Sequence, residues 1–260
     1  MEISTEKVCS ALNLLSRLAP ACIRIRLNAE EFGITEFMKL ASKEVKPSDI
    51  VLDAGAGSRP YKKYFSHAKY QSTDFEDMPG ESGKSKHDFV CNLENIPKQE
   101  NSYDVVINTQ VLEHVEHPQK VMNELYRILK PDGKLFLTAP QSWGVHGEPN
   151  HFFNYTKYGL QSLFKNAGFK IVYIKPRGGM FWYLGDRIKK LPRYLLYQHL
   201  SSKKDGVITI KPTPLGIALI LPCLAAIPFC ELLIPLLFFH LDFLDKKQDY
   251  TLGYACYCKK

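Results

Sequence analysis

Short apolar runs and helix-like segments alternate through the middle of the chain, and this order most constrains its fold. The clearest helical patterns are residues 118–133 and 156–169, where apolar positions recur every three or four residues. Strands that alternate with helices pair in parallel and are covered on both faces. The order therefore predicts a doubly wound α/β fold with a mostly parallel, seven-stranded sheet. Six of its strands are expected at residues 49–55, 69–74, 87–93, 103–109, 133–140 and 169–175.

Both ends of this pattern carry further elements. Residues 6–19 and 29–43 read as amphipathic helices, and residues 249–260 read as a final strand. More than seventy residues separate that strand from the one before it, far more than an ordinary connection needs. The sequence therefore predicts a helical insertion. The predicted parts are N-terminal helices that pack on the core (1–47), a cofactor-binding core (48–176), the insertion (177–248) and the final strand (249–260).

The first apolar run ends in a turn that contains one acid and two glycines, Asp53, Gly55 and Gly57. Ligands of open parallel sheets bind outside the carboxyl ends of the strands. Glycine lets the backbone approach such a ligand closely. The dinucleotide fingerprint needs a further glycine where this chain has Pro60. The turn alone is equally consistent with a structural role.

Companion segments favour a ligand site. Asp74 ends the second run, "NLENIP" (92–97) follows the third, "VLEHV" (111–115) follows the fourth, and "LKPDG" (129–133) precedes the fifth. Together with the glycine turn, they resemble the class I S-adenosylmethionine-dependent methyltransferases, and in particular the type 11 subfamily. The resemblance runs from about residue 49 to residue 169. It implies a methyltransferase that uses S-adenosyl-L-methionine as its cofactor.

The resemblance also implies the residues that bind the two polar ends of the cofactor. Asp53, Gly55 and Gly57 would line its methionine part. Asp74 would accept hydrogen bonds from both ribose hydroxyls. Ser58 or Arg59 stands where a third glycine is common in this turn, so we expect the methionine part to be held differently from the family pattern.

The remaining cofactor contacts are implied for the ends of the third and fourth strands. Asn92 and Leu93 would flank the adenine, with the Asn92 side chain facing its amino group. The family commonly has Asp at that position, and an amide oxygen accepts a hydrogen bond more weakly. Asn108 and Thr109 would lie beneath the sulfonium.

The segment 146–160 would lie beside the transferred methyl group. It resembles a family segment in which His, Pro, an acid and Arg precede an aromatic–Thr pair, but here His151 replaces the acid and Asn154 replaces the Arg. His146 and His151 are the candidate bases, because histidine titrates near neutral pH. Both could equally be solvated loop residues. No metal site is expected, and Glu113 and His114 are expected to shape the loop after the fourth strand.

The insertion contains an apolar segment, residues 215–241, whose only formal charge is Glu231. Its length suits a membrane span, but three prolines interrupt it. The basic and aromatic stretch 181–200 precedes it, a combination typical of helices at anionic bilayer surfaces. Three alternatives follow: attachment to a membrane surface through residues 178–246, a lid over the acceptor, and a true span.

The charge distribution argues against a nucleic-acid-binding protein. The chain has a net charge of +7, but most of this charge belongs to residues 177–211, which contain eight basic residues and two acids. The rest of the chain is almost balanced, so no basic surface extends over the whole protein. The seven cysteines form no CxxC pair, which favours reduced thiols and a protein that faces the cytosol. The first twenty residues lack the pattern of a signal peptide. We therefore expect a cytoplasmic protein attached to the inner face of a membrane.

The expected function is methyl transfer to a small, lipophilic or lipid-linked acceptor, with oxygen as the methylated atom. A soluble glycan, nucleotide-sugar or natural product is the alternative acceptor. A non-catalytic scaffold with a cofactor fold, which binds a partner or a membrane, is the alternative from another class. The sequence does not predict the oligomeric state.

Overall fold

The computed structural model of the protein describes residues 26–75, 87–204 and 207–260. The chain divides into two compact units. One unit comprises residues 33–177 and 251–260 and contains the large sheet; the other contains residues 178–250 and the described residues up to Phe32. The division before residue 33 falls inside helix α4 (Ala29–Lys43). The predicted helix at 6–19 lies outside the described residues, whereas the helix predicted at 29–43 is confirmed.

The large sheet has seven strands in the order β3-β2-β1-β4-β5-β9-β6. Strands β1 to β5 pair in parallel, whereas β9 lies antiparallel between β5 and the edge strand β6. Strand order reverses between β1 and β4, which places the switch point at the centre of the sheet. The predicted fold class is confirmed. The strands are β1 (Ile50–Ala54), β2 (Lys69–Asp74), β3 (Phe89–Val90), β4 (Tyr103–Thr109), β5 (Leu129–Pro140), β6 (Lys170–Pro176) and β9 (Gly253–Lys259).

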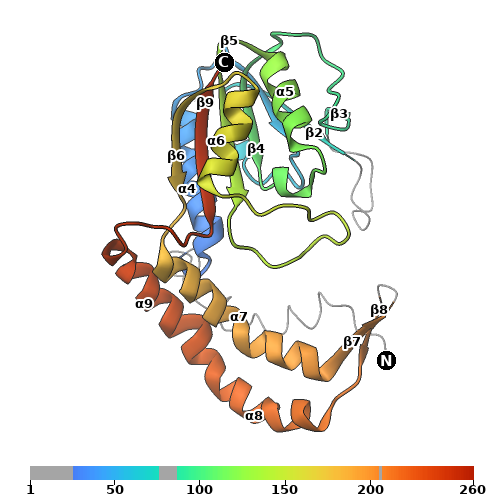
Figure 1. Ribbon diagram of the computed structural model, residues 1–260, viewed down its shortest axis with the longest axis vertical. Helices are drawn as coiled ribbons and strands as arrows, with labels where there is room; N and C mark the ends of the chain where they lie inside the picture. Colours follow the sequence, from blue (N-terminus) through green and yellow to red (C-terminus); the bar gives the residue numbers. More distant parts are fainter. Residues whose placement is uncertain (1–25, 76–86, 205–206) are drawn as a thin grey trace. The chain divides into compact units, whose positions relative to one another are not determined.

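Helices cover both faces of this sheet (Figure 1). On one face, α5 (Pro118–Ile128) and α6 (Lys157–Asn166) pack on alternate strand residues such as Leu137 and Cys256. On the other face, the part of α4 that follows Phe32 packs on residues such as Phe136. Successive strand residues point to opposite faces, so a run that is apolar throughout fills both cores. Three short 3₁₀ turns complete the helices: η1 (Lys62–Tyr64), η2 (Leu112–His114) and η4 (Asp242–Leu244).

The boundary between α5 and β5 differs from the prediction. The sequence predicts a helix that Pro131 and Gly133 end and a strand from Gly133, but α5 already ends at Ile128 and β5 begins at the next residue. Leu129 already pairs with Tyr103 of β4, and the register then shifts before the regular ladder begins. A proline at position 131 cannot continue a helix, and here the chain uses that break to enter the sheet early. By contrast, Thr156 caps α6 as predicted, accepting a hydrogen bond from the Gly159 amide at 3.1 Å.

The second unit is a helical hairpin. Its first arm is α7 (Met180–Leu200), and a two-stranded ribbon, β7 (Ser201–Lys204) with β8 (Val207–Ile210), turns the chain back. The returning arm is a continuous helical segment (Figure 1). This arm consists of α8 (Pro214–Pro228), the π-helical turn η3 (Phe229–Leu233) and α9 (Ile234–Leu241).

The prolines of the returning arm do not break it. Pro214 occupies the first turn of α8, where its missing amide would have no partner in any case. Pro235 is the second residue after the π-helical turn and lies in the first turn of α9, and such π-helical turns locally interrupt the regular α-helical hydrogen bonds. The helix from Pro214 to Leu244 is 31 residues long with a mean hydropathy of 2.4, and only 17 % of its apolar window is buried. By length and composition it could cross a membrane.

Polar contacts tie the two arms of the hairpin together. Asp242 accepts hydrogen bonds from the amides of Gly179 and Trp182, at 2.9 and 3.0 Å, and so caps the start of α7. The Trp182 ring stacks on Phe239 with 4.8 Å between ring centroids. Glu231, the charge inside the apolar arm, is buried and forms a two-point ion pair with Arg193 of α7.

Candidate active site

The predicted cofactor residues gather at the carboxyl edge of the sheet, where strand order reverses. Asp53 lies near the end of β1 and pairs in register with Ile107 of β4 and with Ser72 of β2. The glycine turn follows directly. The ends of β1, β2 and β4 therefore lie side by side, as the position of a ligand crevice in a doubly wound sheet requires.

Asp53 is a buried carboxylate with one unused oxygen. Its side chain is 1 % exposed, and Tyr70 donates a hydrogen bond to its Oδ2 at 2.6 Å. Its Oδ1 has no hydrogen-bond partner among the described residues. Burial raises the pKa of Asp53 to about 7; the nearby charge of Asp74 raises it further, and the hydrogen bond from Tyr70 lowers it. A cation beside Oδ1 would favour the ionised form.

The glycine turn is closed by Asp74. The Asp74 Oδ2 atom accepts a hydrogen bond from the Gly57 amide at 2.8 Å, and its Oδ1 accepts one from the Phe75 amide at 2.8 Å. Each carboxylate oxygen can accept a second bond, so ribose hydroxyls could still bind there. A Cβ on Gly57 would meet no heavy atom within 4 Å, which shows open space on that side of the turn.

Asn108 supports the turn from below. It is fully buried at the end of β4, and its amide group donates a hydrogen bond to the carbonyl of Ala54 at 2.8 Å. Its Oδ1 has no hydrogen-bond partner among the described residues. Thr109 follows it and pairs in register with Thr138 of β5. The structure thus brings Asn108 and Thr109 to the same edge as Asp53, and their contact with the sulfonium stays a prediction.

The residues predicted to flank the adenine already have structural contacts. The Oδ1 atom of Asn92 accepts a hydrogen bond from the Glu94 amide at 2.8 Å and forms a local turn. The Leu93 side chain is 6 % exposed and belongs to the core beneath α5. Their positions after β3 agree with the predicted order of the site. Whether either residue contacts the adenine stays a prediction.

Three histidines meet at the same edge of the sheet. The ring centroids of His146 and His151 lie 4.4 Å apart, and the ring of His114 lies 4.8 Å from His146 and 5.7 Å from His151. Burial lowers the pKa of His151, and the neighbouring rings of His146 and His114 lower it further. The two predicted bases are therefore brought together, and His114, which the sequence assigned only to the loop, joins them.

The loop that carries His146 and His151 is fastened to the end of β4. The amide of Phe152 donates to the carbonyl of Glu113 at 2.8 Å, and the hydroxyl of Tyr155 donates to the carbonyl of Leu112 at 2.9 Å. In the same loop, the Asn154 side chain bonds both the amide and the carbonyl of Trp143. These contacts hold the histidine-bearing loop against η2.

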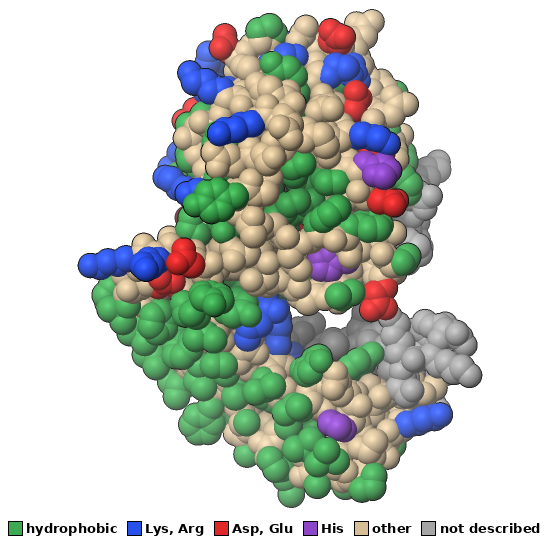
Figure 2. All heavy atoms as spheres, in the orientation of Figure 1, with side chains coloured by type: hydrophobic (Ala, Val, Ile, Leu, Met, Phe, Trp, Pro, Cys, Tyr) green, Lys and Arg blue, Asp and Glu red, His purple; other side chains and the backbone are tan. Residues whose placement is uncertain are grey.

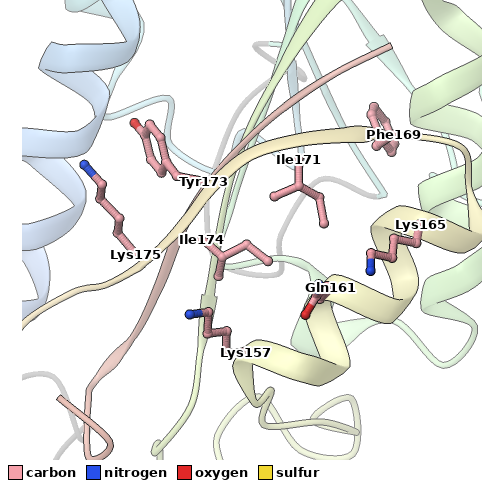
Figure 3. A pocket seen from close by; sticks show the side chains of 8 residues that line it. All are labelled: Lys157, Gln161, Lys165, Phe169, Ile171, Tyr173, Ile174 and Lys175. Carbon is pink, nitrogen blue, oxygen red and sulfur yellow. The ribbon is translucent and has the colours of Figure 1, made fainter. Parts of the chain in front are cut away.

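A cavity of about 640 Å³ lies elsewhere, along the edge strand β6 (Figure 3). Its floor is apolar, and three lysines surround it: Lys157, Lys165 and Lys175. It contains none of the predicted cofactor residues. We assign it no part in the candidate site.

Comparison with known proteins now decides the family. A family model described as a methyltransferase domain matches residues 27–174, which is more than half of the chain and includes the glycine turn and the histidines. The chain belongs to the methyltransferase family. Its sheet order and its carboxyl-edge turn agree with the class I, S-adenosylmethionine-dependent members of that family.

Individual proteins resemble this methyltransferase over different shares of its length. An uncharacterized protein of Methanocaldococcus jannaschii is 32% identical over 164 residues, which are 59% of this chain and 70% of that protein. A probable tRNA methyltransferase 9B of Bos taurus is 26% identical over 42% of this chain, and the match spans a quarter of the relative's length.

A shorter match and a structural match complete the comparison. The mitochondrial 2-methoxy-6-polyprenyl-1,4-benzoquinol methylase of Caenorhabditis elegans is 38% identical over 52 residues, which are 20% of this chain and 18% of that protein. Among solved structures, the MccD protein superposes with a TM-score of 0.50 at 12% identity, covering 86% of this chain and 96% of that one. This structural likeness concerns the fold alone.

The residues at the edge fit S-adenosylmethionine, the cofactor of the family. A buried carboxylate oxygen on Asp53 lacks a partner where the cationic methionine end would bind, and the space beside Gly57 is open. When bound, the cofactor supplies a methyl group activated by a sulfonium. The chain itself supplies the acid, the glycine backbone and the supporting amide of Asn108.

The two glycines of the turn should respond differently to alanine. At Gly55, where φ is +81°, a Cβ would lie 2.4 Å from Cγ2 of Val111, so we expect Gly55→Ala to destabilise the methyltransferase by about 2–3 kcal/mol. At Gly57, where φ is +49°, a Cβ meets nothing, so Gly57→Ala should cost about 1 kcal/mol. Urea unfolding of both variants measures the difference. Equal losses would contradict the assigned contact between Gly55 and Val111.

Proposed function

We propose that this methyltransferase methylates an oxygen atom of a small lipophilic acceptor at the surface of a membrane. The observation that carries the proposal is the long apolar helix Pro214–Leu244, most of whose apolar window is not buried. A soluble enzyme rarely exposes a continuous apolar face of this size without a binding role. Because the cofactor is made in the cytosol, we place the enzyme on the cytoplasmic side.

The exposed face of the hairpin is apolar along its length. Figure 2 shows hydrophobic side chains gathered over this unit. Leu221 is 78 % exposed, Ile217 is 59 % exposed and Leu224 is 46 % exposed, and their spacing of four and three residues puts them on one side of α8. A bilayer would remove this apolar surface from water.

The basic residues of α7 have partners inside the hairpin. Lys190 and Arg187 pair with the buried Asp186, at 2.8 and 3.0 Å. Lys189 donates to the carbonyl of Leu27 at 2.7 Å. Part of their charge is therefore balanced within the unit, and their contact with anionic headgroups stays a prediction. We expect attachment to depend on apolar burial and to change little with salt.

The histidine loop supplies what O-methylation needs from the protein. The acceptor oxygen forms a bond to the methyl carbon while the carbon–sulfur bond breaks, and the hydroxyl proton passes to an imidazole ring. His146 and His151 are the candidate proton acceptors because they lie at the carboxyl edge that the cofactor site occupies. The loop, which is fastened to η2, would also align the acceptor oxygen with the methyl group, and such alignment lowers the barrier to transfer.

The names of two relatives suggest different acceptors. A polyprenyl benzoquinol methylase agrees with a lipophilic acceptor, although the match covers a fifth of this chain. A probable tRNA methyltransferase suggests RNA. The exposed apolar helix favours the lipophilic class, because RNA binding relies on exposed positive charge.

Labelled methyl transfer tests the proposal. The full-length protein receives S-adenosylmethionine with a labelled methyl group together with vesicles made from a total lipid extract that contains quinones, or with aqueous sugar and RNA pools. We expect the label in the organic phase, and we expect the protein to float with the vesicles. Label confined to sugars or RNA would refute the lipophilic acceptor.

A matched pair of triple variants tests the role of the helix. Replacing Ile217, Leu221 and Leu224 with Glu should abolish flotation and lower transfer to vesicle lipids at least tenfold, whereas replacing the same residues with Met should preserve both. Cofactor binding by calorimetry should be equal in the two variants. Flotation of the Glu variant at the wild-type level would exclude attachment through this face. The alternative that the insertion is a lid over the acceptor would then be favoured.

A further inference from the structure

A carboxylate and two imidazoles converge at the carboxyl edge of the sheet. Glu113 and His114 belong to η2, after β4, and His146 belongs to the loop after β5. One side-chain ligand atom from each of the three residues lies within 4.8 Å of the others. The Glu113 side chain is 1 % exposed, so this carboxylate lies inside the protein beside two imidazole rings.

The hydrogen bonds of the two histidines fix which nitrogen carries the proton. The Nδ1 atom of His114 lies 2.5 Å from the carbonyl oxygen of Asn150, and the Nδ1 atom of His146 lies 3.0 Å from that of Gly144. A carbonyl only accepts, so both Nδ1 atoms donate, and in the neutral rings both Nε2 atoms keep a lone pair. Histidines that bind metal ions are typically oriented by such a bond from the second ring nitrogen.

The loop also holds the His114 ring in place. A Cβ on Gly147, where φ is +62°, would lie 3.4 Å from Cε1 of His114, so the backbone packs directly on that ring. The carbonyl of Glu113 accepts from the amide of Phe152. Two segments more than thirty residues apart are thus joined around the three side chains, which limits their freedom before any ligand binds.

We propose that Glu113, His114 and His146 form a binding site for one divalent transition-metal ion. Two imidazoles and one carboxylate suit Zn²⁺, Mn²⁺, Fe²⁺ or Co²⁺, whereas Mg²⁺ and Ca²⁺ prefer oxygen ligands. Ligands about 2.0–2.2 Å from one ion lie about 3–3.5 Å apart, so the three side chains must close by about 1 Å. A loop side chain such as His146 can make that movement.

His151 has a different place in this site. Its ring stands 4.4 Å from that of His146, centroid to centroid. With His146 as a ligand of the ion, His151 is the remaining candidate for accepting the acceptor's proton. The metal site itself does not depend on which acceptor the enzyme uses.

Titration of the full-length protein with Co²⁺ tests the site. Cobalt bound to imidazoles gives visible d–d absorption, so binding is read without any measurement of activity. We expect one Co²⁺ per chain, displaced by Zn²⁺. His146→Ala and His114→Ala should each weaken binding at least about tenfold, because even the loss of a residue that only orients a metal ligand costs that much. A wild-type protein that binds neither ion, or a His146→Ala variant that binds as tightly as wild type, would overturn the proposal.

His117→Ala is the matched control, because His117 is an exposed histidine three residues from His114. It should bind Co²⁺ like wild type; an equal loss in this variant would show that binding is not specific to the proposed ligands and would overturn the site. Calorimetry with S-adenosylmethionine shows whether each variant is folded. Since His146 lies in a loop, His146→Ala should keep cofactor affinity while losing the metal ion.

Discussion

Replacement of Asp53 by asparagine is expected to weaken binding of S-adenosylmethionine about 10- to 100-fold. The change keeps an oxygen that accepts the hydrogen bond from Tyr70 but removes the negative charge opposite the cationic methionine end. Because the pKa of Asp53 is about 7, wild-type affinity should rise as pH increases through 7, when the carboxylate ionises. In Asp53→Asn that rise should disappear. Calorimetric titration between pH 6 and 8, values chosen to bracket that pKa, measures both effects.

The same substitution should stabilise the protein in the absence of cofactor. The pKa of Asp53 is about 7 in the folded protein against 3.8 when unperturbed, so the folded state holds a proton over an interval in which the unfolded chain has lost it. The free energy of unfolding therefore falls as pH rises through that interval, by up to about 4 kcal/mol for a shift of this size. Asparagine carries no such penalty. Urea unfolding at pH 8 should show Asp53→Asn to be more stable than wild type.

Asp104 supplies the opposite case. Burial alone would raise the pKa of Asp104, but the hydrogen bonds from Lys130 and from the Ile50 amide lower it, and the net pKa is below the usual value. Its charge therefore stabilises the folded state above the unfolded pKa and is lost as pH falls. Asp104→Asn should destabilise the protein at pH 8 and leave cofactor affinity unchanged. If Asp53→Asn loses stability as Asp104→Asn does, the Asp53 carboxylate is ionised and fully hydrogen-bonded even without the cofactor, which would contradict the prediction.

Arg193→Met is expected to destabilise the helical hairpin by about 3–5 kcal/mol. Arg193 is the partner of Glu231, whose side chain is only 4 % exposed within an otherwise apolar arm. Removing the guanidinium leaves a buried charge without compensation, which is the costly way to break an ion pair. The measurement uses a Trp143→Phe background, in which Trp182 is the remaining tryptophan and reports on the hairpin alone.

The double variant Arg193→Met, Glu231→Leu is the control. Replacing both charges by apolar side chains removes the desolvation cost together with the pair, so its stability should return close to that of wild type. Fluorescence of Trp182 during urea unfolding follows both variants. If the single variant is as stable as the double one, the Glu231 carboxylate is solvated or protonated and the pair does not hold the arms together.

The centre of the sheet could be predicted closely because its strands are short, apolar on both faces and bounded by polar turns. The bounds predicted for β2 and β4 agree with the structure, and so does the helix at 29–43. Residues such as Leu137 and Phe136 fill opposite cores, and each must be apolar for that reason. Tertiary contacts and local pattern point to the same elements in this region.

The differences arise where contacts far apart in the sequence decide the structure. A local pattern shows that Pro131 ends a helix but not that Leu129 will pair with Tyr103. Likewise, His114 was assigned to its loop because the sequence does not show that His146 folds back onto it. The only signal in the sequence is that Glu113 and His114 follow one strand of the sheet and that His146 and His151 follow the next one.

Strand β9 has a consequence for the order in which the molecule is made. It fills the gap between β5 and β6, yet its residues, Gly253–Lys259, follow the entire apolar hairpin in the chain. During translation the ribosome must release the hairpin before the sheet can close. Under the proposed membrane attachment, the apolar arm would therefore reach the bilayer while the sheet still lacks an inner strand.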